Sequence, residues 1–172
     1  MSYKVIDQIF ESEKPESIFE IGCASGKLLE YAQSLYGDIK VGGLDISVQG
    51  LKEAKETFPK YADNFILHNI NDPWPIEDNS YDIVFSVSVL MYLTNPKEAI
   101  REMMRVGKKI IISEYHSPDT DEWGGLLKYQ NEEKTEFSGS GIYRNYIKLF
   151  TDMGYKPKIK FQGLKSIIEC QK

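Results

Sequence analysis

The stretch that decides the fold is SIFEIGCASGKLLEYA, residues 17–32. An apolar run ends in Glu20, Gly22 and Gly26 follow, and apolar residues then recur at helical spacing. A strand that runs through a glycine turn into a helix is typical of nucleotide-binding α/β folds, because glycine lets the backbone approach a ligand at the helix N-terminus. This stretch therefore predicts a nucleotide site, and the residues around the glycines indicate which nucleotide.

The alternation of strand and helix continues to Tyr115, which predicts a parallel, doubly wound α/β sheet. Strand patterns lie at 17–22, 40–47, 64–70, 81–90 and 108–116. Helical patterns lie at 2–12, 26–36, 47–61 and 95–107, and Ser47 is the expected N-cap of the third.

The alternation breaks after residue 116. Polar residues and glycines predict a loop over 117–141, with one helical turn around 123–130. A helix is expected over 142–154, with Ile142, Tyr146, Leu149 and Phe150 on its apolar face, and two final strands at 156–163 and 165–172.

The composition is that of one globular domain over residues 1–172. Of its residues 41% are hydrophobic and 27% charged, and the net charge of −5 argues against a nucleic-acid partner. No apolar run approaches the roughly 20 residues that cross a bilayer, and the N-terminus lacks the pattern of a secretory signal. No membrane partner is expected, and a cytoplasmic location is the default expectation. Cys23 and Cys170 lack ligand spacing, so neither a metal site nor a disulfide framework is expected.

The glycine turn does not match a dinucleotide site. The G-x-G-x-x-G fingerprint would need glycine where Ala24 stands, and a third glycine where Lys27 stands. Glu20, two residues before the first glycine, would oppose a phosphate and suits a cationic ligand. A nucleotide-dependent oxidoreductase is therefore disfavoured.

Three segments together resemble the class I S-adenosylmethionine-dependent methyltransferases. EIGCASG (residues 20–26) resembles their motif I, and GLDIS (residues 43–47) resembles motif II, an acid at the tip of the second strand. Residues 69–93 resemble the stretch from the adenine-binding loop through the fourth strand. The resemblance implies a three-layer α/β/α fold with a seven-stranded, mostly parallel sheet, into which a C-terminal hairpin inserts one antiparallel strand. It also implies S-adenosylmethionine as cofactor and S-adenosylhomocysteine as product.

The resemblance assigns expected roles to the cofactor contacts. The glycine turn would lie under the methionine end, and Glu20 would order the turn and attract the ammonium group. Asp45 would accept hydrogen bonds from both ribose hydroxyls. Asn69 and its neighbours would read the adenine, and the backbone of Ser86 would hold the amino group. The candidate contacts are Glu20, Gly22, Cys23, Ala24, Gly26, Asp45, Ile46, Asn69, Ile70, Asn71 and Ser86.

Several of these residues have simpler interpretations. Asp45 also fits a helix cap, and Asn69 an ordinary turn residue, with Asp72 as another residue for the adenine. Cys23 lies near a helix start, where the pKa of a thiol can fall, but a small residue that fills the turn is the favoured interpretation. Ala24 is tolerable if its φ stays negative.

The acceptor side is expected beyond the fourth and fifth strands. His116 follows the fifth strand directly and is the candidate general base, unless it only orients substrate or is merely exposed. Tyr92 is a second catalytic candidate, with Tyr115, Asp119 and Arg144 as substrate contacts; Arg144 fits a surface role equally well. His68 is interpreted as structural.

These features predict transfer of a methyl group to a small-molecule acceptor at oxygen or nitrogen, with a sugar or secondary metabolite favoured. Only about 16 residues precede the first strand, where many small-molecule methyltransferases carry lid helices. The acceptor would therefore be covered by residues 117–141, by a second copy or another partner chain, or not at all. We interpret 117–141 as a lid-like insert. The alternative is an inactive cofactor-binding module that regulates or scaffolds a partner protein.

Overall fold

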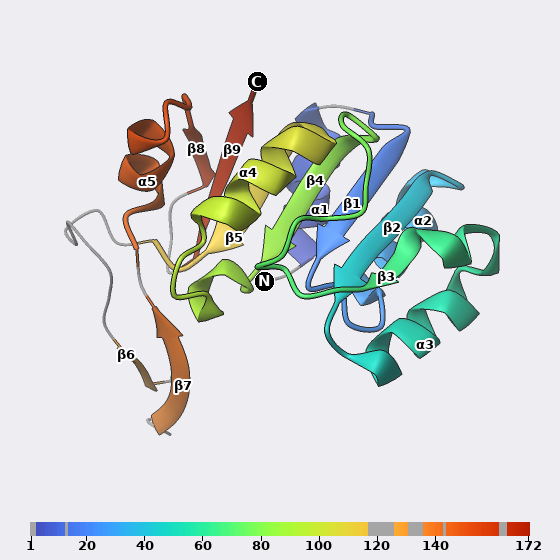
Figure 1. Cartoon of the computed structure of the whole chain (residues 1–172), viewed down its shortest axis with the longest axis horizontal. Coiled ribbons are helices and arrows are strands. Elements are labelled where there is room, and N and C mark those ends of the chain that lie inside the picture. The colour runs from blue at the N-terminus through green and yellow to red at the C-terminus, as the bar shows by residue number, and fades with distance from the viewer. Residues whose placement is uncertain (1–2, 13, 117–125, 131–135, 143, 162–164) are drawn as a thin grey trace.

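The computed structural model describes residues 3–12, 14–116, 126–130, 136–142, 144–161 and 165–172. A seven-stranded sheet forms the centre of the molecule, in the order β3-β2-β1-β4-β5-β9-β8 (Figure 1). Its strands are β1 (Ser17–Ile21), β2 (Lys40–Asp45), β3 (Phe65–Leu67), β4 (Tyr81–Val87), β5 (Gly107–Glu114), β8 (Lys158–Phe161) and β9 (Ser166–Gln171).

The sheet confirms the topology implied by the resemblance. Strands β1 to β5 are parallel, whereas β9 runs antiparallel to β5 and to β8. The last strand in sequence therefore lies inside the sheet, between β5 and β8. Strand order reverses at β1, since β2 lies on one side of it and β4 on the other, and ligands of open α/β sheets bind at such a point.

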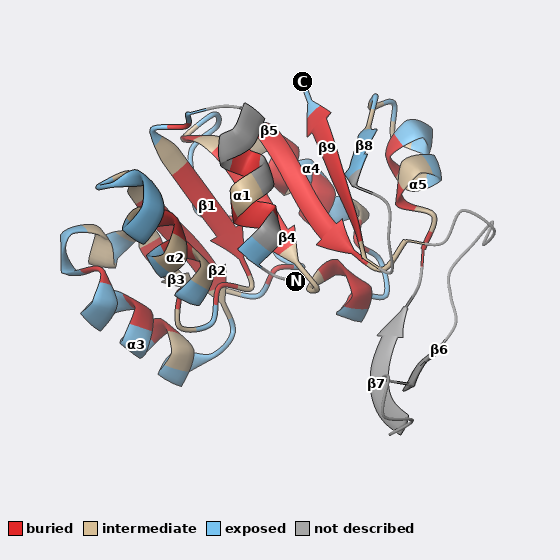
Figure 2. Cartoon of the chain, turned by 180° about the vertical axis from the view of Figure 1, so that it is seen from behind, coloured by how far each residue is buried: buried red, intermediate tan, exposed pale blue. Residues whose placement is uncertain are grey.

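Helices cover both faces of the sheet, as expected for three layers. The buried side chains of α1 (Tyr3–Ser12), α2 (Lys27–Tyr36) and α3 (Val48–Thr57) pack in one cluster on one face. Those of α4 (Lys97–Val106) and α5 (Tyr146–Asp152) pack in a second cluster on the other face. Figure 2 shows β1, β4, β5 and β9 largely buried, whereas β8 at the edge of the sheet and the outer faces of the helices are exposed.

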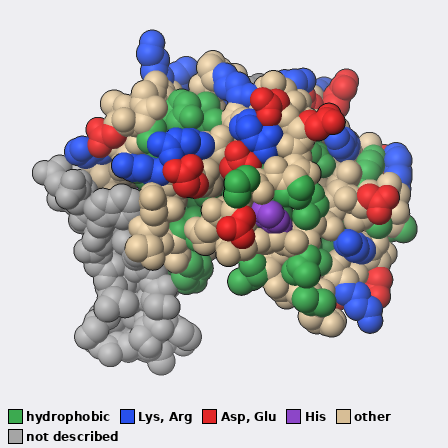
Figure 3. Space-filling view, viewed as in Figure 1, with side chains coloured by type: hydrophobic (Ala, Val, Ile, Leu, Met, Phe, Trp, Pro, Cys, Tyr) green, Lys and Arg blue, Asp and Glu red, His purple; other side chains and the backbone are tan. Residues whose placement is uncertain are grey.

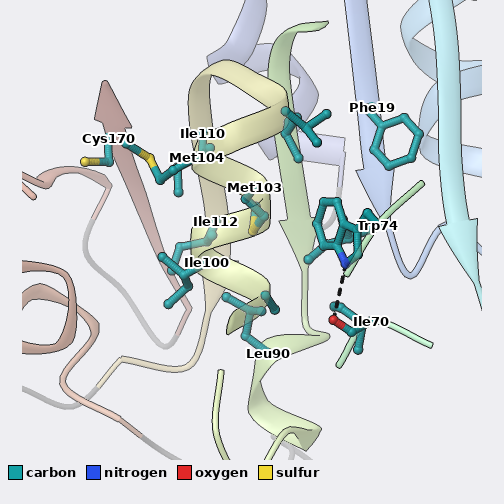
Figure 4. Packing of buried hydrophobic residues seen from close by; sticks show 14 of the residues in the cluster. Phe19, Ile70, Trp74, Leu90, Ile100, Met103, Met104, Ile110, Ile112 and Cys170 are labelled. Atoms are coloured by element: carbon teal, nitrogen blue, oxygen red, sulfur yellow. Dashed lines mark hydrogen bonds between the residues drawn. The ribbon is translucent and has the colours of Figure 1, made fainter. Parts of the chain in front are cut away.

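The core beneath α4 fixes the loop between β3 and β4. Phe19 of β1 and Met103 of α4 pack in one cluster with Trp74 from that loop (Figure 4). The indole Nε1 of Trp74 donates to the carbonyl of Ile70 at 3.2 Å. The residues that follow β3 are thereby held at the carboxyl ends of the strands.

The segment after β5 differs from the prediction. Residues 126–130 belong to a strand, β6 (Leu126–Gln130), which pairs with β7 (Glu136–Ile142), so the predicted helical turn is wrong there. Helix α5 begins at Tyr146 and not at Ile142, because Asn145 is its N-cap and accepts from Lys148 N. Among the described residues, no helix is long and apolar enough to span a membrane.

Candidate functional site

A cavity of about 420 Å³ opens at the carboxyl ends of β1, β2, β3 and β4. Figure 3 shows hydrophobic and acidic side chains and a histidine together on the face that carries this end of the sheet. The volume is within the range of small-ligand pockets. The residues that line the cavity are Gly22, Leu44, Asp45, Ile46, His68, Asn69, Ile70, Asn71, Ser88, Val89, Tyr92 and Leu93.

The glycine turn forms the β1 side of the cavity. Gly22 has a φ of 68° and donates its N–H to the carbonyl of Leu44 at 2.8 Å, which ties the turn to the end of β2. A Cβ at Gly22 would lie 2.4 Å from Cγ2 of Val89. Any larger residue at position 22 would therefore be strained and would collide with the opposite wall.

Ala24 departs from the expectation of a negative φ. Its φ is 46°, in the left-handed region, so the condition set from the sequence is not met. The N–H of Ala24 donates to Oδ2 of Asp45 at 2.8 Å, and its backbone lies against Gly50 of α3. Ala24 does not line the cavity, so its methyl group takes no room from the ligand there.

Gly50 allows α3 to pack directly on the turn. A Cβ at Gly50 would lie 2.9 Å from the carbonyl carbon of Ala24. We expect Gly50→Ala to lower the free energy of unfolding by about 1 kcal/mol, because overpacking against backbone outweighs the gain in helix propensity. Urea denaturation measures the change. Gln49→Ala, on the exposed side of the same helix, should change stability by less than about 0.5 kcal/mol, and equal effects of the two variants would contradict this account.

Asp45 ends β2 and holds two backbone amides. Oδ2 accepts from Ala24 N, and Oδ1 accepts from Ser47 N at 2.7 Å. Ser47 is the N-cap of α3, as predicted, and its hydroxyl accepts from Gly50 N at 3.0 Å. Each oxygen of Asp45 keeps a further lone pair, so the carboxylate can order the turn and bind a ligand at the same time.

Glu20 is buried beneath the turn. Its side chain is 5% exposed, and Oε2 has no hydrogen-bond partner among the described residues. Burial, with a smaller contribution from the charge of Asp45, raises the pKa of Glu20 well above its usual range. Glu20 does not line the cavity, so its expected role toward the ammonium group stays a prediction; a cationic group nearby would favour its ionised form.

Cys23 is a packing residue of the turn. It is 4% exposed, and a Cβ at Gly43 would lie only 2.6 Å from its Sγ. Burial, followed by the charges of Glu20 and Asp45, raises the pKa of the thiol. Its closeness to a helix start therefore does not produce a reactive thiolate, and the geometry argues against a direct cofactor contact. Gly26, the N-cap of α2, likewise lies outside the cavity lining.

The loop after β3 forms the opposite end of the cavity. Oδ1 of Asn69 accepts from Asn71 N at 3.1 Å and from Asn71 Nδ2 at 3.0 Å. Both residues line the cavity, as does Ile70, whereas Asp72 does not. His68 also lines the cavity because β3 ends at Leu67, which corrects its interpretation as a strand residue.

Ser86 does not reach the cavity. It is fully buried inside β4, and its hydroxyl donates to Oε1 of Glu114 at 3.2 Å. Ser88 and Val89, just beyond the strand, line the cavity instead. The strand ends at Val87, and the role expected for the backbone of Ser86 stays a prediction.

Glu114 fixes this turn after β4. Oε1 accepts from Val89 N at 2.9 Å and from Leu90 N at 3.0 Å. Burial raises the pKa of Glu114 to about 7, although the two backbone hydrogen bonds act in the opposite direction. Ser88, at a φ of 59°, is held in a conformation that non-glycine residues rarely adopt.

His116 is not positioned as the predicted base. Its Nδ1 accepts from Tyr146 N at 3.2 Å, so the neutral ring carries its proton on Nε2. Burial lowers its pKa, with partial compensation from a hydrogen bond to the backbone of Arg144. His116 does not line the cavity, and the geometry argues against its action as general base.

The four remaining acceptor candidates differ in where they lie. Tyr92, in the short helix η2 (Leu90–Tyr92), is 62% exposed and lines the cavity. Tyr115 lies beside Lys165, whereas Asp119 lies outside the described residues. Arg144 is 3% exposed, and its guanidinium donates to the carbonyls of Leu90, Leu93 and Thr94, which argues against binding of a substrate anion.

Sequence reasoning missed several residues around the cavity: Leu44, His68, Ser88, Val89, Leu93 and Lys165. The rule that ligands bind beyond the carboxyl ends of parallel strands identifies most of them, once the ends of β3 and β4 are known. Lys165 follows from no motif, because it reaches Ser88 only through the antiparallel strand β9.

Known proteins resemble the chain in sequence and fold. The model of the methyltransferase domain family matches residues 19–110, more than half of the chain. Ajmaline N-methyltransferase of Rauvolfia serpentina is 26% identical over 82% of this chain and 52% of its own length. Malonyl-[acyl-carrier protein] O-methyltransferase 2 of Ilyobacter polytropus is 26% identical over 86% of this chain and 58% of its own.

A solved structure shows the same fold. The sugar N-methyltransferase KedS8 from Streptoalloteichus sp. superposes with a TM-score of 0.71 at 13% identity, over 99% of this chain and 86% of that one. The chain spans only about half the length of the two curated relatives described above.

Proposed function

Because this chain belongs to the class I S-adenosylmethionine-dependent methyltransferases, we propose that it methylates a small-molecule acceptor at oxygen or nitrogen. The observation that carries the proposal is the cavity at the switch point of the sheet, where the turns after β1, β2, β3 and β4 converge. Two of the relatives are named for ajmaline and for a sugar, which supports a small acceptor such as a sugar or secondary metabolite. The family match and these relatives give no support to the inactive module.

The residues around the cavity fit S-adenosylmethionine. Gly22 leaves room for the side chain of Val89 beside the cavity, and no lysine or arginine of the kind that binds phosphate is among the lining residues. Asp45 has lone pairs for the ribose hydroxyls, and Asn69 and Asn71 offer amide groups for the adenine. Burial raises the pKa of Glu20, and the positive charge of the ammonium group would lower it again and favour the carboxylate.

The main contribution of the protein to methyl transfer would be to position the acceptor against the cofactor. When bound, the cofactor supplies a methyl group on a positively charged sulfur, which is already activated for displacement. The rigid turn held by Glu114 and the exposed Tyr92 would orient the acceptor and exclude water. An acceptor that is nucleophilic without losing a proton first needs no general base.

The insert remains part of this proposal. Strand β7 lies close to η2, which carries Tyr92, and this contact supports a cover over the acceptor that includes β7. Much of the segment 117–141 lies outside the described residues, and a partner chain is the other candidate cover.

Ligand-dependent thermal unfolding tests the cofactor site. At a concentration 100 times its dissociation constant, S-adenosylmethionine or S-adenosylhomocysteine should raise the Tm by about 5–10 °C, because ligand that binds only the folded state adds about 2.7 kcal/mol. The same concentration of NAD should leave the Tm unchanged. A rise with NAD and none with S-adenosylmethionine would overturn the proposal. Formation of S-adenosylhomocysteine with a panel of acceptors then measures activity.

A further inference from the structure

We propose that Lys165 binds an anionic group of the methyl acceptor, so that this chain prefers acceptors that carry a carboxylate. The inference rests on the proposed function and names a substrate class for the same site. The inference arises from the side chain of Lys165, whose position follows from no sequence motif. The side chain neither packs in the core nor forms an ion pair with another described residue.

Lys165 stands at the acceptor end of the sheet. It directly precedes β9, whose first residue, Ser166, pairs with Glu114 at the carboxyl end of β5. The antiparallel insertion of β9 thus brings a lysine to the edge where the parallel strands end. Ligands of such sheets bind at this edge.

The ammonium group of Lys165 reaches the wall of the cavity. Nζ donates to the hydroxyl of Ser88, which lines the cavity. Nζ also lies 4.9 Å from the centroid of the Tyr115 ring, in a cation–π contact. An ammonium group has three donors, so Lys165 retains hydrogen-bonding capacity after its contact with Ser88.

Lys165 differs from the lysines around it in its partners. Lys109 and Lys160 both pair with Glu169, and Lys108 pairs with Asp82. Lys165 is partly buried, and across the described parts of the chain no carboxylate forms an ion pair with it. A cation that is partly removed from water and faces only a hydroxyl and a ring is stabilised when an anion binds beside it.

The position of the partner hydroxyl is fixed. Ser88 has a left-handed φ of 59°, and its N–H donates to the carbonyl of Ser113 at 3.0 Å. The next two amides are held by buried Glu114. Strain of this kind concentrates at binding sites, and here it presents a rigid hydroxyl that holds the lysine at the cavity rim.

Matched pairs of acids and amides test the proposal. With the protein saturated by S-adenosylhomocysteine, calorimetric titrations would compare acetate with acetamide, malonate with malonamide, benzoate with benzamide, and salicylate with salicylamide. We expect at least one acid to bind about tenfold more tightly than its amide. Lys165→Met should abolish that preference and leave the affinity for S-adenosylhomocysteine within about twofold, whereas Lys165→Arg should retain most of it.

Lys158→Met is the matched control, since it removes the same charge from exposed strand β8. It should leave the preference for the acid intact. The proposal is overturned if no acid binds better than its amide, or if the preference survives in Lys165→Met. It is also overturned if Lys165→Met weakens S-adenosylhomocysteine tenfold, because Lys165 would then hold the cofactor. If the unmodified chain does not bind S-adenosylhomocysteine at all, the proposed function is overturned together with this inference. If it binds S-adenosylhomocysteine but shows no preference for an acid, only this inference is overturned.

Discussion

At pH 5, replacement of Glu114 by alanine is expected to lower the free energy of unfolding by about 3 kcal/mol. The carboxyl oxygen Oε1 accepts from Val89 N and Leu90 N, and alanine would leave both amides without their acceptor. Each buried amide without a partner costs about 1–3 kcal/mol. Denaturant unfolding measures the loss, and a change below about 1 kcal/mol would show that water replaces the carboxyl group.

The pH dependence of stability gives the same residue a second test. Burial raises the pKa of Glu114 from 4.5 to about 7, so between these values the folded state keeps a proton that the unfolded chain has lost. Stability therefore falls as pH rises through this window, by about 3 kcal/mol in all. Burial of Glu20 acts in the same direction, whereas the lowered pKa of His116 acts in the opposite direction.

Glu114→Gln isolates the contribution of Glu114. The amide resembles the protonated acid, so this variant should match the unmodified chain near pH 5 and exceed its stability by about 1–3 kcal/mol near pH 8. The contributions of Glu20 and His116 are common to both proteins and cancel in the comparison. Parallel pH profiles of the two proteins would contradict the assignment.

Asp45→Ala is expected to weaken binding of S-adenosylmethionine by about 1–3 kcal/mol, or roughly 5- to 150-fold. The variant removes the oxygens that face the cavity and also the acceptors of Ala24 N and Ser47 N. Isothermal calorimetry measures the affinity. The Tm of the unliganded protein shows separately how much of the effect comes from the loosened turn.

Two further variants make the Asp45 result specific. Asp45→Asn keeps one acceptor oxygen and should give an intermediate affinity. Asp63→Ala removes the same charge from an exposed position that does not line the cavity, and should bind as tightly as the unmodified chain. An unchanged affinity in Asp45→Ala would remove Asp45 from the site.

The sequence predicted the sheet well because its signals are local. Apolar runs, the glycine turn and the Ser47 cap each depend on a few neighbouring residues, and β1 to β5 lie where these patterns occur. The glycine turn and Asp45 were likewise recognisable from residue spacing. The left-handed φ of Ala24 was not, since it follows from the hydrogen bond to Asp45 across the turn.

The acceptor side could not be predicted in the same way. The direction of His116 depends on Tyr146, which is 30 residues away, and the burial of Arg144 depends on carbonyls of the loop after β4. The end of β4 at Val87 likewise decides which residues line the cavity, and Ser88 and Val89 do so whereas Ser86 does not. Such features depend on tertiary contacts that one sequence does not reveal.

Because β9 lies between β5 and β8, the central sheet can be completed only after the last residues of the chain have been synthesised. The turns proposed to bind the cofactor come from residues 20–93, which leave the ribosome well before residues 166–171. Until β9 arrives, the edge of β5 has no neighbour on that side, and unpaired edges of this kind invite aggregation. The same late strand brings Lys165 to Ser88, so a nascent chain completes the turns around the cavity first and receives this lysine only when β9 pairs with β5.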